Sequence, residues 1–137
     1  MNRSVDLFDS TYSHFEAEVL ARIRQLFTDP VVVTGLVSNE ELAARSSIGY
    51  FLFAPPGVNE RLIAEAGFEL ARQQDVTENA AMISKRWHDA RAEDHAALVQ
   101  IEGEERHVGL QSFFAVVHRL TSERRLSRFA YMARKPI

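Results

Sequence analysis

The stretch 62-LIAEAGFELARQQDVTENA-80 joins elements of different kinds within one short segment. Apolar residues at helical spacing from Leu62 predict a short helix, and Gly67 is well placed to end it. The next residues, 68-FELARQQDV-76, favour a strand. Thr77 is a preferred N-cap residue and predicts the start of a second helix. A helix–strand–helix order of this kind is typical of a layered α/β domain.

Downstream of this stretch, the sequence predicts two long helices and a final strand. Apolar residues at helical spacing continue from Thr77 to Gly103, where we expect the first helix to end. A second helix carries the apolar residues from Val108 to Leu120. The closing residues 125-RLSRFAYMARK-135 have apolar side chains on both faces, which is typical of an interior strand.

Upstream, 4-SVDLFDS-10 favours a strand. The apolar residues from Phe15 to Phe27 recur at three- and four-residue spacing and predict an amphipathic helix. We expect Asp29-Pro30 to interrupt this helix, because the residue before a proline is pushed out of the helical region. The residues 31-VVVTG-35 that follow are expected to be extended.

A second helix start lies between these residues and the opening stretch. Ser38 and Glu41 form a capping box, since each side chain can satisfy a backbone N–H of the other residue. We expect the helix that follows to run to about Gly49. Pro55 and Pro56 then exclude a helix, because proline lacks the backbone donor.

The composition is that of one soluble domain covering residues 1–137. Apolar residues make up 46% of the chain and charged residues 26%, and the net charge of −3 gives no reason to expect nucleic acid or a membrane as a partner. The chain has no cysteine, which excludes disulfides, thiol catalysis and thiolate metal sites. The N-terminal residues contain no apolar run long enough for a signal peptide or a membrane span, so we expect a cytoplasmic protein.

Several segments, in this order along the chain, resemble the C-terminal half of class I S-adenosylmethionine-dependent methyltransferases of the small-molecule type. The residues 6-DLFDSTYSHF-15 are similar to the family's fourth strand and the loop after it. The residues 66-AGFEL-70 and 75-DVT-77 are similar to its last helix-to-strand passage, and 126-LSRFAYMARKP-136 to its final strand. The similarity covers nearly the whole chain and is strongest from Phe27 onward.

The resemblance implies a truncated, Rossmann-like α/β fold of about four strands. Along the sheet, the strands would follow the chain order first, second, fourth, third, with the last strand antiparallel to the others. The helices at about 77–124 would form a two-helix lid over the substrate.

The family's methyl donor is held by a glycine-rich turn after the first strand and by an acidic residue after the second. The glycines of this chain never form the pattern G-x-G. We therefore expect a methyltransferase-like protein without the donor-binding half, which binds S-adenosylmethionine only with a complementing half. On its own it would act as a small-molecule-binding or auxiliary subunit. The alternative is an enzyme: a methyltransferase completed by a partner, or a cofactor-independent isomerase or cyclase that uses the lid pocket.

The loop that contains Asp9 and Ser10 lies near the donor's sulfonium and the substrate in the family that the chain resembles. The resemblance therefore makes Asp9 and Ser10 candidate substrate-binding residues. His14 follows this loop and is a candidate general base. The alternative for His14 is a loop histidine with a local hydrogen bond.

The first predicted lid helix contains 86-RWHDAR-91, which supplies four more candidate site residues. His88 is a second candidate acid or base. Arg86 and Arg91 are candidate substrate ligands, since the planar fork of arginine suits a carboxylate or phosphate. Trp87 is a candidate substrate contact, with simple packing against the preceding helical turn as the alternative.

Tyr50 belongs to an aromatic group that is expected in the core, part of which can line a pocket under the lid. His88 and His95 lie on one helical face but lack a third ligand at a matching spacing, so we expect no metal site.

The expected absence of the donor-binding half also bears on assembly. Without that half, the strand at 4–10 loses its neighbour, and an unpaired edge strand or an uncovered apolar surface invites association. We therefore expect a homodimer with an isologous contact at this strand or at the helix after it. The outer faces of Val5 and Leu7, together with residues 31–37, are the surface expected to be exposed.

Overall fold

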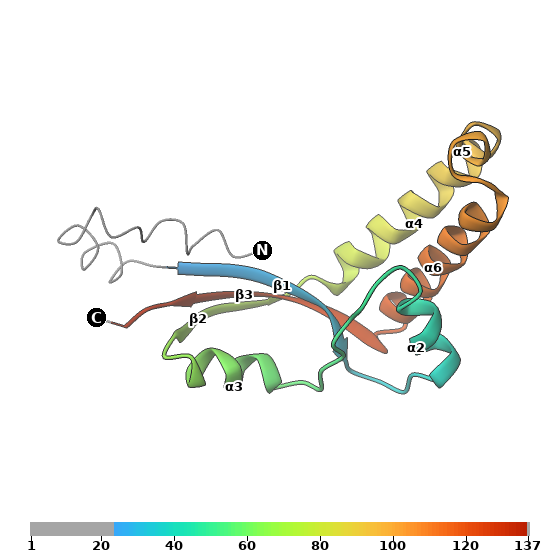
Figure 1. The fold of residues 1–137 in the computed structure, drawn as a ribbon. Helices are drawn as coiled ribbons and strands as arrows, with labels where there is room; N and C mark the ends of the chain where they lie inside the picture. Colours follow the sequence, from blue (N-terminus) through green and yellow to red (C-terminus); the bar gives the residue numbers. More distant parts are fainter. Residues whose placement is uncertain (1–23, 137) are drawn as a thin grey trace.

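The computed structural model describes residues 24–136 of the chain. These residues form a three-stranded sheet and five helices (Figure 1). The elements, in chain order, are β1 (Arg24–Val33), α2 (Asn39–Arg45), α3 (Val58–Glu65), β2 (Glu69–Asp75), α4 (Thr77–Glu93), α5 (His95–Glu102), α6 (Glu104–Ser122) and β3 (Leu126–Arg134). The α/β class expected from the sequence is confirmed for this part of the chain.

The strand order in the sheet is β1-β3-β2, and β3 is antiparallel to both neighbours. β3 takes the central position because it is apolar on both faces, and its residues Leu126, Tyr131 and Ala133 are almost completely buried. The predicted order of the second, fourth and third strands is confirmed, as is the antiparallel last strand. The predicted first strand, at 4–10, lies outside the described residues.

Residues 24–27 belong to β1, so the helix predicted to run to Phe27 is wrong over this part; residues 15–23 lie outside the described range. Exposed and half-buried side chains alternate along this part of β1, with the period of a strand. Phe27 stacks on Tyr131 of β3, with ring centroids 5.0 Å apart. Pairing with β3 supplies backbone hydrogen bonds that stabilise the strand over the predicted helix.

Pro30 lies inside β1 and does not end it. The pairing of β1 with β3 shifts register between Asp29 and Val32, and a bulge on an edge strand is where a sheet tolerates proline. The Asp29 carboxylate accepts a hydrogen bond of 2.9 Å from the backbone N–H of Val31.

The capping box at the start of α2 is confirmed. Ser38 Oγ accepts from the Glu41 N–H at 3.1 Å, and the Ser38 N–H donates to Glu41 Oε2 at 2.9 Å. The helix ends at Arg45, earlier than the predicted Gly49. Glu41 also binds Arg125 at 2.8 Å and so ties α2 to the turn before β3.

Helix α3 lies along one face of the sheet, below it in Figure 1. Ile63 of α3 packs into the main apolar cluster with Tyr131 and Ala133 of β3. Gly67 follows α3 with a φ of 84°, a conformation that favours glycine, so the predicted end of this helix is confirmed.

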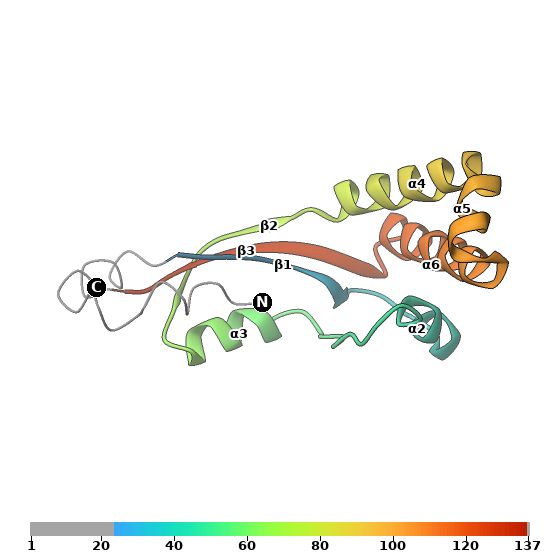
Figure 2. The same cartoon turned by 45° about the horizontal axis from the view of Figure 1, so that its top comes forward.

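Helices α4 and α6 form an antiparallel pair that extends beyond one end of the sheet, with α5 at the tip (Figures 1 and 2). β2 leads into α4 and α6 leads into β3, so both long helices leave the sheet at the same end. The single helix predicted from Thr77 to Gly103 is broken at Asp94 into α4 and α5. Gly103 ends α5 as predicted, with a φ of 86°.

Thr77 is not the N-cap of α4. The cap position is Val76, and the Asp75 carboxylate accepts from the Thr77 N–H at 2.9 Å. The buried hydroxyl of Thr77 instead accepts from the backbone N–H of Arg128 at 3.0 Å, so it joins α4 to β3.

No helix within residues 24–136 is both long and apolar enough to cross a membrane.

Candidate functional site

A pocket of about 250 Å³ lies where the α4–α6 pair meets α2 and the sheet. We call it the helix–sheet pocket. It is lined by Pro30 of β1, Arg45 of α2, Ala80, Ile83, Ser84 and Trp87 of α4, Phe113, Phe114, Val117 and Thr121 of α6, and Arg128 of β3. It is somewhat smaller than a typical small-molecule site, for which volumes of roughly 300 to 1,000 Å³ are common.

Aromatic side chains form one wall of this pocket. Trp87 stacks on Phe114, with ring centroids 5.8 Å apart, and Phe114 meets the edge of Phe113 at 5.3 Å. Trp87 is 57% exposed, whereas Phe113 is only 6% exposed. The wall therefore runs from an open rim at Trp87 to a buried end at Phe113, and it offers stacking and apolar contact to a bound group.

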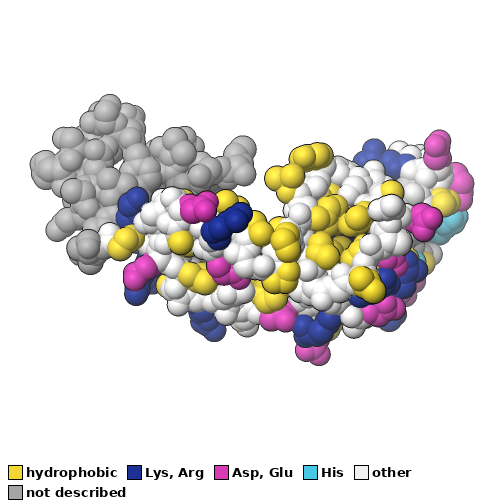
Figure 3. Space-filling view, turned by 90° about the horizontal axis from the view of Figure 1, so that it is seen from below, with side chains coloured by type: hydrophobic (Ala, Val, Ile, Leu, Met, Phe, Trp, Pro, Cys, Tyr) yellow, Lys and Arg dark blue, Asp and Glu magenta, His cyan; other side chains and the backbone are white. Residues whose placement is uncertain are grey.

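Apolar side chains also gather on the surface of the molecule. Figure 3, which shows the molecule from below, has hydrophobic side chains concentrated in the middle of that face, between the two ends of the molecule. The acidic and basic side chains on that face lie mostly around this region.

Two arginines bring positive charge to the helix–sheet pocket. Arg45, in the last turn of α2, is only 5% exposed, and its guanidinium lies 4.4 Å from the ring centroid of Phe51 and 5.2 Å from that of Phe113. A cation in the last turn of a helix is favoured by the helix dipole. Burial, and then the positive charge of Arg128, lower the pKa of Arg45.

Arg128 approaches the pocket from β3. Its Nη2 donates to Thr28 Oγ1 of the neighbouring strand β1 at 3.0 Å. Within residues 24–136, neither Arg45 nor Arg128 forms an ion pair. In the same range, Arg45 Nη1 and Arg128 Nε are buried without a hydrogen-bond partner.

The predicted site residues are distributed over several places. Asp9, Ser10 and His14 lie outside the described residues. Trp87 lines the helix–sheet pocket, as the predicted contact with a ligand requires. Tyr50 lies in the loop between α2 and α3 and is 88% exposed, so the expectation that it belongs to the core is wrong, and it does not line the helix–sheet pocket.

Three of the predicted substrate ligands also meet at a second place. Arg86, Trp87 and Arg91 line an open depression of about 400 Å³ at the junction of α4 and α5. His88 lines neither this depression nor the helix–sheet pocket. Its Nδ1 lies 3.3 Å from Asp89 Oδ1 on the same helix.

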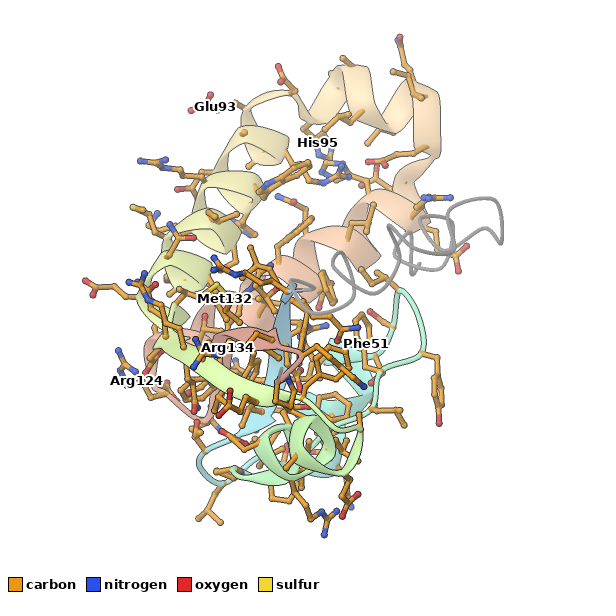
Figure 4. The ribbon with its side chains drawn as sticks, turned by 90° about the vertical axis from the view of Figure 1, so that its left-hand side faces the viewer. Phe51, Glu93, His95, Arg124, Met132 and Arg134 are labelled. Carbon is orange, nitrogen blue, oxygen red and sulfur yellow. The ribbon has the colours of Figure 1, made fainter. Side chains whose placement is uncertain are left out.

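Arg91 is part of a polar cluster between the far ends of α4 and α6 that the sequence analysis did not predict. Its Nη2 donates to Glu102 Oε1, and His107 Nδ1 lies 3.1 Å from the same oxygen. His95 meets His107 edge to face, with ring centroids 4.6 Å apart, and Figure 4 shows the His95 side chain lying between the helices.

The Glu102 carboxyl is held in its charged form in this cluster. Burial acts to raise the pKa of Glu102, but hydrogen bonds from Arg91 and His107 outweigh it and lower the pKa. Arg91 therefore does meet a carboxylate, as its chemistry suggested, but that carboxylate belongs to the chain. Residues 91 and 102 lie on either side of the break at Asp94, and only that unpredicted break brings them together.

No group of three or more His, Asp or Glu side chains in the described part of the chain is placed to hold a metal ion. His88 and His95, which share a helical face in the sequence, lie in different helices of the structure.

No protein-family model matches the chain, and no curated protein matches it in sequence. Solved structures do match it. Phospholethanolamine N-methyltransferase 2 from Haemonchus contortus, solved with phosphomonomethylethanolamine and S-adenosylhomocysteine, superposes with a TM-score of 0.73 at 16% identity; the match covers 85% of this chain and 27% of the enzyme.

Two cyclopropane synthases give a similar result. The cyclopropane synthase MmaA2 from Mycobacterium tuberculosis has a TM-score of 0.71 at 17% identity, over 90% of this chain and 50% of its own. The mycolic acid cyclopropane synthase CmaA1, solved with S-adenosylhomocysteine, has a TM-score of 0.72 at 13% identity, over 84% of this chain and 45% of its own.

The chain thus has the fold of a part of S-adenosylmethionine-dependent methyltransferases. It spans half or less of the length of the three proteins. The resemblance stated from the sequence is confirmed as a likeness of fold.

Proposed function

We propose that this chain forms the substrate-side part of an S-adenosylmethionine-dependent methyltransferase-like protein, and that its helix–sheet pocket binds a small molecule. The observation that carries this proposal is the pocket itself, which the α4–α6 pair closes against the sheet in a methyltransferase-like fold. α4, α5 and α6 occupy the residues that the resemblance assigned to the lid. By itself the chain acts as a small-molecule-binding or auxiliary unit.

The described residues do not fit the methyl donor. Donor binding of this type needs a glycine-rich turn between a strand and a helix, followed by an acidic residue at the end of a second strand. Gly57 does begin a helix with a positive φ, but the prolines Pro55 and Pro56 precede it and no G-x-G surrounds it. We therefore derive no methyl-transfer step from these residues, and we assign donor binding to a complementing segment or chain.

The first test is calorimetric titration of the purified chain with S-adenosylmethionine. We expect no binding at micromolar concentrations of the donor. Micromolar binding would show that this chain holds the donor without a complement, and it would overturn the auxiliary role.

The second test addresses the pocket. We expect small aromatic compounds to bind the chain in ligand-observed NMR, and we expect Phe114→Ala to weaken this binding, because it removes the ring that stacks on Trp87. Leu36→Ala is the matched control, since Leu36 is 90% exposed and does not line the pocket. Equal loss in both variants, or no binding of any compound, would contradict the proposal.

An enzyme completed by a partner chain is the second candidate, because the three related structures extend well beyond the matched part. It predicts methyl transfer when the chain is mixed with its complement, with the same Phe114→Ala variant reduced in activity. For the cofactor-independent isomerase or cyclase, His88 gives no support, since it does not line the helix–sheet pocket.

A further inference from the structure

We propose that the helix–sheet pocket recognises a small molecule carrying a carboxylate or phosphate group, which the guanidinium groups of Arg45 and Arg128 bind. This inference rests on the proposed function, that the pocket binds a small molecule, and it adds the chemical class of that molecule.

Arg45 is a buried cation. A buried charge is costly unless an opposite charge or several hydrogen bonds compensate it. Arg45 is 5% exposed, and its Nη1 has no hydrogen-bond partner within residues 24–136. Its contacts with the rings of Phe51 and Phe113 offset only part of the desolvation cost.

Arg128 brings a second positive charge to the pocket that Arg45 lines. Arg45 and Arg128 line the same pocket, and the charge of Arg128 adds to burial in lowering the pKa of Arg45. Two like charges at one partly desolvated place destabilise each other, and an anion between them removes that repulsion.

The other arginines near the end of α6 differ from these two, because they form ion pairs. Arg119 and Arg125 bind Glu41 at 3.4 and 2.8 Å, and Arg124 binds Asp75 at 2.7 Å. These three cations all have carboxylate partners, whereas the two that line the pocket have none among the described residues. Unpaired charge inside a pocket is a mark of a binding site.

The lining of the pocket also indicates the shape of the ligand. Guanidinium groups bind carboxylates and phosphates through paired N–H donors, so the charged end of the ligand belongs beside Arg45 and Arg128. The aromatic wall of Trp87, Phe113 and Phe114 suits an apolar body. A volume of about 250 Å³ restricts that body to a small one.

The chain provides its own reporter for a test. Trp87 is its only tryptophan and lines the pocket, so its fluorescence responds to a ligand bound there. Benzoate and phenyl phosphate supply the two anionic groups on the same ring, and benzamide is the neutral counterpart. We expect both anions to bind, and benzamide to bind at least about tenfold more weakly, because charge-assisted hydrogen bonds are lost. The tighter of the two anions identifies the preferred group.

Variants of the two arginines test whether these side chains cause the preference for the anionic probes. We expect Arg128→Gln to weaken binding of the anions roughly ten- to a hundredfold, and to leave benzamide binding unchanged. Arg128→Lys keeps the charge and is expected to restore part of the affinity. Arg61→Gln is the control, because Arg61 is an exposed cation on α3 in an ion pair with Glu65, away from the pocket.

Thermal unfolding gives a second readout. We expect benzoate or phenyl phosphate to raise the midpoint of the wild-type chain but not that of Arg128→Gln, since a ligand stabilises only the state that binds it. Arg45→Gln is expected to behave in the same way. If that variant does not fold, Arg128→Gln carries the test alone.

Two results overturn the inference differently. If benzamide and benzoate bind equally, or if Arg128→Gln behaves like Arg61→Gln, the anionic class is wrong and the small-molecule pocket stands. If none of the three probes changes the fluorescence and no compound binds in the NMR experiment, the proposed function is wrong as well.

Discussion

Leu120 is the side chain most completely enclosed where the helical pair joins the sheet. It is 0% exposed, near the end of α6, and Leu126 at the start of β3 is 1% exposed. A buried leucine at this junction fixes how α6 enters the sheet, and with it the position of the pocket wall.

We expect Leu120→Ala to lower the free energy of unfolding by about 2–5 kcal/mol, because the lost methyl groups leave a cavity. Leu36→Ala, at a side chain that is 90% exposed, is the matched control and is expected to cost little. Denaturant titration at a fixed pH measures both. Equal stability of the two variants would show that Leu120 is not part of the structural core.

Glu41 is a second residue with a structural role that can be tested, this time by pH. The backbone N–H of Ser38, followed by the Arg125 guanidinium, lowers the pKa of Glu41. A carboxyl whose pKa is lower in the folded chain stabilises the fold at pH values above its unfolded pKa of roughly 4.3. That stabilisation is lost as the pH falls through the lower, folded value.

We therefore expect Glu41→Gln to lower the thermal midpoint at pH 7, with a difference from wild type that shrinks as the pH is taken below about 4.3. Glu65→Gln removes a carboxylate from an exposed ion pair with Arg61 and is expected to change little at any pH. A Glu41→Gln effect that is constant with pH would mean that side-chain size, and not charge, matters at this position.

At the scale of the element, the junction between α5 and α6 depends on backbone conformation. Gly103 has a φ of 86° and a ψ of 157°, a region that is essentially restricted to glycine. Gly109 lies inside α6, and a Cβ added there meets nothing within 4 Å. The two glycines therefore respond to the same substitution in opposite ways.

We expect Gly103→Ala to destabilise the chain by about 1–3 kcal/mol, the usual cost of a strained backbone. We expect Gly109→Ala to stabilise it by up to about 1 kcal/mol, because alanine is the better helix former. Thermal or denaturant unfolding of the Gly103→Ala and Gly109→Ala variants measures both changes in stability. Two changes of the same sign would refute the conformational argument.

The elements that the sequence predicted well are those with local signals. Gly67 and the capping box of Ser38 and Glu41 mark helix boundaries through their own backbone contacts, and both predictions are confirmed. The first half of β1 is different, because its apolar residues also fit a helical spacing. Pairing with β3, which lies far away in the sequence, makes this segment a strand and not a helix, and no local sequence pattern indicates that pairing.

The candidate site likewise contains one residue that the sequence singled out and two that only the folded structure brings together. Trp87, a candidate substrate contact with simple packing as the alternative, lines the helix–sheet pocket and also stacks on Phe114, so its contact with a ligand stays a prediction. Arg45 and Arg128 were not singled out, since each looks ordinary in its own segment. Their common pocket exists only because α2 and β3 approach each other in the folded chain.

At the scale of the whole molecule, the described residues form an extended body, with the helical pair continuing beyond the sheet (Figure 2). β1 and β2 are the edges of the sheet formed by residues 24–136, and every residue of β2 is exposed. Leu26 on β1 is 76% exposed. The expectation that residues 31–37 are exposed is wrong for Val31 and Val32, which are only 4% and 2% exposed because they pack in the core. Exposed strand edges with apolar side chains are places where chains associate.

We propose that the chain forms a homodimer through the side of the sheet on which β1 lies. The sequence predicts another strand, at 4–10, next to the one that includes 31–35, but those earlier residues lie outside the described range. Within that range, Val31 and Val33 are already hydrogen-bonded to Ala54, so the free part of this edge is the first half of β1. An isologous contact there covers the same apolar surface on both copies. Sedimentation at micromolar concentration is expected to show a dimer.

The variant Val5→Lys with Leu7→Lys tests which edge makes the contact. Charges at these positions oppose strand pairing, so we expect this double variant to sediment as a monomer. Leu70→Lys, on the opposite edge strand β2, is the matched control and is expected to remain dimeric. If the wild-type chain is a monomer at these concentrations, the homodimer is wrong. If Leu70→Lys dissociates the dimer and the double variant does not, the contact lies at β2.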